Sequence, residues 1–114
     1  MSASSSQEPS CPLLGTALER RSFLSEHVSA DLAYLWDDAG VDEAYQYAFA
    51  QHYKTVRRFS SLGDDRISLR AAITADFGLD PAGGAIQRSQ MAAVVSSWEA
   101  ARDFIETDNR LKAE

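Results

Sequence analysis

Apolar residues recur every three or four positions along most of this chain, and no stretch alternates apolar and polar residues as a strand does. Glycines and helix-capping residues separate the periodic stretches, and no Asn-Gly or Asp-Gly pair joins two β-branched runs. The pattern predicts an all-α fold, a compact bundle of four to five short helices. With 114 residues, of which 45% are hydrophobic, the chain has enough apolar surface for one modest core.

Start and stop signals place the expected helices. Ser29 is a good N-cap, Gly40 is a left-handed stop, and Asp64 follows Gly63 as a fresh cap. The expected helices occupy residues 12–28, 29–40, 42–62, 64–77 and the stretch from Ala85 onward, with Pro12 in the first turn of the first helix. The breaker-rich segment 78–84 is expected to be a loop.

The first eleven residues differ from the rest of the chain in composition. They are rich in serine and lack apolar periodicity, so residues 1–11 are expected to form a disordered tail before a single helical domain at 12–114. Cys11 is the one cysteine, so no internal disulfide is possible. Neither a secretory signal nor a bilayer-spanning apolar run is apparent, and an intracellular location, cytoplasmic or nuclear, is expected.

No constellation of residues points to catalysis. The chain has two histidines: His27 falls at the end of the first expected helix, where a cation is favourable, and His52 falls on an apolar helix face. We therefore expect His52 to be a core or core-edge residue. Metal-ligand spacings and phosphate-binding loops are also absent from the sequence. The chain is expected to be no enzyme, with no catalytic residues, cofactor or metal.

Charge is distributed unevenly along this acidic chain, whose formal net charge is −6. The 26–43 stretch carries six acids and no Lys or Arg, whereas 54–70 carries five cations against two acids. Three of these cations, Lys54, Arg57 and Arg58, fall on the solvent side of the long helix expected at 42–62, and the aromatic ring of Tyr47 falls on the same side. This surface is a candidate to bind an acidic protein segment, or phosphates with a stacked base. The alternative is that the cations simply pair with the neighbouring acids.

The last expected helix has a second apolar face. Ala93, Ala100, Phe104 and Leu111 cluster on one side, away from the stripe that contains Met91, Val94 and Trp98. Phe104 is the residue that most departs from the polar pattern expected there. Either it folds over the edge of the bundle against the first helix, or this face pairs with another helix in trans. A monomer or weak self-association is expected.

Several short elements between residues 59 and 101 suggest a relative. They are Phe59 and Leu62, Asp64-Asp65-Arg66, Gly78-Leu79-Asp80-Pro81, Val94-Val95, and Trp98-Glu99-Ala100-Ala101. Over roughly residues 40–114, the chain resembles a helical N-terminal module of uncharacterised retroelement-like polyproteins of dinoflagellate algae. The resemblance implies a non-catalytic module of a larger protein and supplies no active-site residues.

Two functions follow as hypotheses. The first is a non-catalytic helical protein-interaction or scaffolding module, part of a larger protein, with a protein partner of unknown identity and no membrane partner. The alternative is an accessory nucleic-acid-binding module that uses the Lys54–Arg70 basic surface, although the net negative charge disfavours it.

Overall fold

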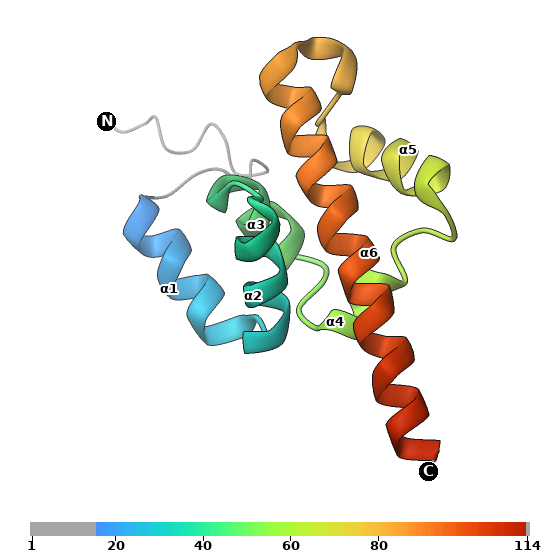
Figure 1. Cartoon of the computed structure of the whole chain (residues 1–114). Coiled ribbons are helices and arrows are strands. Elements are labelled where there is room, and N and C mark those ends of the chain that lie inside the picture. The colour runs from blue at the N-terminus through green and yellow to red at the C-terminus, as the bar shows by residue number, and fades with distance from the viewer. Residues whose placement is uncertain (1–15, 114) are drawn as a thin grey trace.

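The computed structural model describes residues 16–113, and within this range it contains helices and no strands (Figure 1). The elements are α1 (Ala17–His27), α2 (Ala30–Ala39), α3 (Glu43–Ala50), α4 (Val56–Ser60), α5 (Arg66–Phe77), the 3-10 helix η2 (Pro81–Gly83) and α6 (Ala85–Ala113). The predicted all-α fold is confirmed. The predicted tail at 1–11, with Cys11, lies outside the described residues.

Capping explains where the first two helices begin and end. Pro12, the predicted start of the first helix, lies outside the described residues, and α1 begins at Ala17 after a capping box. In this box Thr16 Oγ1 accepts a hydrogen bond from the Glu19 amide (3.0 Å), and Glu19 Oε1 accepts one from the Thr16 amide (2.8 Å). The predicted limits of α2 are confirmed, because Gly40 ends this helix with a φ of +88°.

The prediction of one long helix at 42–62 is wrong, because the chain forms two helices there with a turn between them. Thr55 adopts an extended conformation, and its Oγ1 accepts a hydrogen bond from the Arg58 amide (3.2 Å), which starts α4 as a new helix. The Lys54 carbonyl instead accepts from the Ser29 amide at the α1–α2 junction (2.9 Å). As a result His52 lies in the turn and is exposed, so it is not a core residue. Its ring stands edge-on to Phe77 at the edge of the core, with centroids 6.0 Å apart, in agreement with the core-edge alternative.

The core lies between α6 and the helices that pack against it, chiefly α2 and α4 (Figure 1). Its centre is an aromatic cluster in which Trp36 stands edge-on to Phe59, with ring centroids 5.5 Å apart, and lies 6.0 Å from Phe49. Aliphatic side chains with no exposed surface complete the core, namely Leu32, Leu69, Ile73, Leu79 and Val94. Burial of this apolar surface is the main stabilising contribution to the fold.

Helix α6 is longer than the body of the bundle, and its C-terminal end projects beyond α4 (Figure 1). Between Glu106 and Lys112 only Asp108 is partly buried. The described molecule is accordingly elongated, with principal extents of 59 × 33 × 19 Å. No helix among residues 16–113 is both long and apolar enough to cross a membrane.

Candidate functional site

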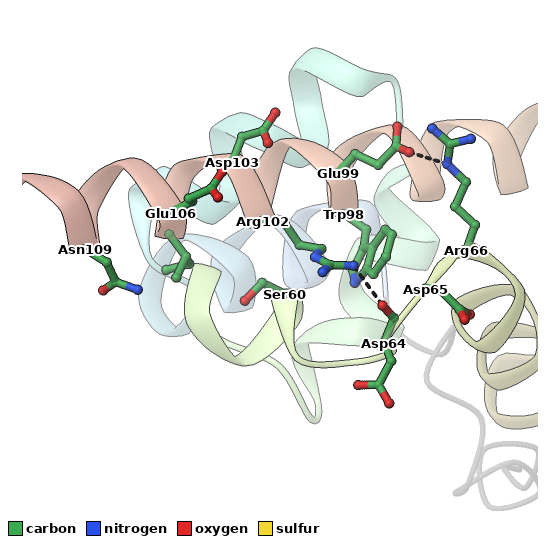
Figure 2. A pocket seen from close by; sticks show the side chains of 11 residues that line it. Ser60, Asp64, Asp65, Arg66, Trp98, Glu99, Arg102, Asp103, Glu106 and Asn109 are labelled. Atoms are coloured by element: carbon green, nitrogen blue, oxygen red, sulfur yellow. Dashed lines mark hydrogen bonds and ion pairs between the residues drawn. The ribbon is translucent and has the colours of Figure 1, made fainter.

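A groove lies between the 60–66 segment and the C-terminal half of α6 (Figure 2). It is a shallow groove open to solvent, with a volume of about 780 Å³. Trp98 is buried and Ile105 partly buried, whereas most of the polar residues around them are exposed. The lining residues are Ser60, Asp64, Asp65, Arg66, Trp98, Glu99, Arg102, Asp103, Ile105, Glu106 and Asn109. We call this site the Trp98 groove.

A tight corner between α4 and α5 forms one wall of the groove. Gly63 passes so close to α5 that a Cβ atom at this position would lie 2.9 Å from the Leu69 backbone nitrogen. Asp65 then caps α5 by accepting a hydrogen bond from the Ser68 amide (2.8 Å). Hydrogen bonds from Ser68 to this carboxylate hold the pKa of Asp65 below its ordinary value of 3.8. The cap expected at Asp64 is therefore wrong by one residue.

Two arginines tie this corner to α6. Arg66, at the start of α5, forms an ion pair with Glu99. Arg102 donates a hydrogen bond through Nη1 to the backbone carbonyl of Asp64 (3.0 Å), as Figure 2 shows. These contacts bridge two segments more than thirty residues apart in the chain.

The indole of Trp98 is the most unusual group in the groove. Trp98 is only 2% exposed, and the guanidinium carbon of Arg102 lies 4.7 Å from the centroid of its ring, a cation–π contact. Its Nε1 is buried and has no hydrogen-bond acceptor. A buried donor without an acceptor costs about 1–3 kcal/mol. The Nε1 of Trp36 also lacks an acceptor, but Trp36 is enclosed in the aromatic cluster, whereas an exposed arginine side chain covers Trp98.

Negative charge predominates around the groove. Five carboxylates line it, from Asp64, Asp65, Glu99, Asp103 and Glu106, against the guanidinium groups of Arg66 and Arg102. In the described part of the chain, no three Asp, Glu, His or Cys side chains converge on a point where a metal ion would fit. The five carboxylates are therefore spread along the groove and do not surround one point.

The structure separates the predicted basic surface into two places. Tyr47 and Lys54 both lie against Phe23 of α1: the Tyr47 ring is 5.2 Å away edge-on, and Lys54 Nζ is 5.9 Å from the ring centroid. Arg57 lies instead beside α6, where its Nη2 donates to Asn109 Oδ1 at one end of the Trp98 groove (3.3 Å). Arg58 is exposed on α4. The expectation that these residues share one helix face is wrong, because no continuous helix connects them.

The predicted second face of α6 is present only in its C-terminal part. Phe104 is 40% exposed and Leu111 is 65% exposed, whereas Ala93 is buried. Ala93 belongs to the core cluster, and Gln90, one turn earlier in α6, contacts the α2–α3 junction by donating to the Gly40 carbonyl (3.3 Å) and accepting from the Asp42 amide (2.8 Å). The outer face predicted from the helical wheel is therefore wrong for Ala93.

Sequence reasoning did not identify the Trp98 groove. The sequence predicts a helix stop at Gly63 followed by a cap at Asp64, and no role was assigned to Glu99, Arg102 and Glu106. Successive intervals of three and four residues place Glu99, Arg102 and Glu106 on one face of a helix, and this spacing is the signal that was present. The groove itself arises only when the corner packs against α6.

Comparison of the chain with protein-family models, curated proteins and solved structures gave no match. The resemblance to a polyprotein module stays a prediction. The functional conclusion therefore depends on the geometry and charge of the groove.

Proposed function

We propose that this chain is a non-catalytic protein-interaction module of a larger protein, and that it binds a basic segment of a partner protein in the Trp98 groove. The observation that carries the proposal is the buried Trp98 Nε1 without an acceptor, covered by an exposed arginine and surrounded by carboxylates. We explain the unpaired donor of Trp98 by an acceptor that a ligand supplies, because buried polar groups are normally hydrogen-bonded.

Arg102 indicates how a ligand would fit. Its guanidinium occupies the face of Trp98, so the site already accommodates the side chain of an arginine. An arginine of the partner replaces it there with the same cation–π geometry, and a backbone carbonyl of the partner accepts from Trp98 Nε1. Further cations of the partner lie near Glu106 and the side chain of Asp64, both of which are exposed.

A labelled peptide in which arginine alternates with serine tests the proposal by fluorescence anisotropy, with glutamine in place of arginine in a control peptide. The arginine peptide should bind and the glutamine peptide should not. Glu106→Gln should weaken binding roughly two- to fivefold, the effect of removing one exposed ion pair. Glu26→Gln is the matched control, because it removes the same charge from an exposed glutamate outside the groove and should leave the affinity unchanged.

Two results would contradict the proposal. Equal loss of affinity from both glutamate variants would mean that net charge, and not the groove, attracts the peptide. Binding of a mixed single-stranded oligonucleotide, with a steep dependence on salt and a loss on changing Lys54, Arg57 and Arg58 to Gln, would favour the nucleic-acid alternative.

A further inference from the structure

The projecting end of α6 carries an apolar seam that is separate from the Trp98 groove. The α6 seam consists of Ala100, Phe104, Thr107 and Leu111, which follow one another at intervals of four, three and four residues. This is the spacing of the a and d positions of a coiled coil. Phe104 and Leu111 are 40% and 65% exposed, and Thr107 is exposed as well.

We propose that two copies of this chain associate through the α6 seam with their α6 helices antiparallel. In this arrangement Phe104 of one copy faces Thr107 of the other, and Leu111 faces Ala100. Each large side chain then meets a small one, as interdigitating helix faces require. The contact is symmetric, so the same four residues of each copy form the interface.

Charges beside the seam select the antiparallel orientation. With Phe104 at an a position, Asp103 and Arg110 take g positions and Asp108 takes an e position. Antiparallel helices bring g positions together, which pairs Asp103 of each copy with Arg110 of the other. Parallel helices bring g against e and would place Asp103 against Asp108, an unfavourable contact of like charges.

The shape of the molecule permits this arrangement. The C-terminal end of α6 projects beyond its own bundle (Figure 1). In the proposed dimer, residues 106–113 of each copy lie against residues 98–105 of the other. At 100° per residue, Arg102 and Glu106 of the Trp98 groove lie on the opposite side of α6 from the seam. Asp103 lies between the two surfaces, and in Figure 2 its carboxylate points away from Asp64. The dimer uses Asp103 from the groove lining and leaves Arg102 and Glu106 accessible in both copies, and this inference does not depend on the proposed function.

Sedimentation equilibrium over a wide concentration range tests the proposal. The seam is short and contains only two large apolar side chains, so a dissociation constant in the high-micromolar to millimolar range is expected. Phe104→Glu and Leu111→Glu should each abolish association. Asp103→Arg should weaken it roughly tenfold by opposing arginines at two places. The double change Asp103→Arg with Arg110→Asp should restore it, because both pairs re-form with their signs exchanged.

Circular dichroism establishes that each variant is folded, and Leu111→Glu provides the readout if Phe104→Glu destabilises the domain. A monomeric wild-type chain at millimolar concentration would overturn the proposal. Stronger association of Asp103→Arg would overturn the antiparallel orientation, because a parallel dimer would then pair the new arginine with Asp108. Failure of the double change to restore association would also contradict it.

Discussion

Replacement of Phe59 by alanine should remove most of the stability of this domain. Phe59 has no exposed surface and stands among three rings: Trp36 at 5.5 Å, Phe49 at 6.1 Å and Tyr53 at 6.4 Å between centroids. It is also one of only two buried residues of α4, a helix of five residues. Helix α4 is too short to be stable without this contact.

The magnitude follows from burial. Truncation of a buried phenylalanine typically costs about 3–5 kcal/mol, and a domain of this size has a free energy of unfolding of about 5–15 kcal/mol. Loss of edge-on ring contacts, each worth about 0.5–1.5 kcal/mol, is part of this cost. Phe59→Leu keeps much of the volume and should lose roughly 1–2 kcal/mol.

Urea denaturation followed by circular dichroism measures the effect. The free energy of unfolding of a small domain falls by about 1–3 kcal/mol per molar urea. The urea concentration at the unfolding midpoint should therefore be roughly 2 M lower for Phe59→Ala than for the wild type. Ile67→Ala is the matched control, because Ile67 is 76% exposed, and it should change stability by less than about 0.5 kcal/mol. A loss below about 1 kcal/mol for Phe59→Ala would refute the placement of α4 against the aromatic cluster.

Three further outcomes are expected. Gly63→Ala should destabilise the domain by about 1–3 kcal/mol in urea denaturation, because its Cβ would meet the Leu69 backbone. Burial, and then the charge of Asp76, raise the pKa of Tyr53 above 10.0, so the folded state favours the neutral phenol. The neutral phenol of Tyr53 therefore contributes fully to stability below pH 10.0, and this contribution is lost as the pH rises through the pKa of the folded state. Above pH 10.0 the free energy of unfolding should fall more for the wild type than for Tyr53→Phe. Replacement of Lys54, Arg57 and Arg58 by glutamine should change the free energy of unfolding by less than about 0.5 kcal/mol per residue, because all three side chains are exposed.

Apolar periodicity and capping residues were sufficient to predict the fold class, most helix positions and much of the core. The burial of Trp36, Phe59, Val94 and Trp98 follows from the apolar stripes. The break at 51–55 was missed because apolar spacing continues through it, so the stripe alone favours one helix. The contrary signal was Thr55, which forms a cap only when the Lys54 carbonyl bonds outside the helix, to the Ser29 amide.

Long-range packing determined what the sequence could not predict. Trp98 belongs to the same buried cluster as Phe49 and Phe59, and packing also places Arg102 over its ring, a cation–π contact that the apolar stripe did not predict. Trp36 is the tryptophan at the centre of the aromatic cluster. Helical wheels place residues on a face but do not show what covers the face, and for this reason the Trp98 groove became apparent only from the structure.

The indole resonance of Trp98 provides the most direct test of the proposed function. The chain has two tryptophans, so a ¹H–¹⁵N spectrum contains two indole N–H signals, which Trp98→Phe assigns. On titration with the arginine–serine peptide, the Trp98 signal should move downfield as Nε1 gains an acceptor, while the Trp36 signal stays in place. Binding of the peptide with the Trp98 signal unmoved, or with both signals shifted equally, would contradict the account.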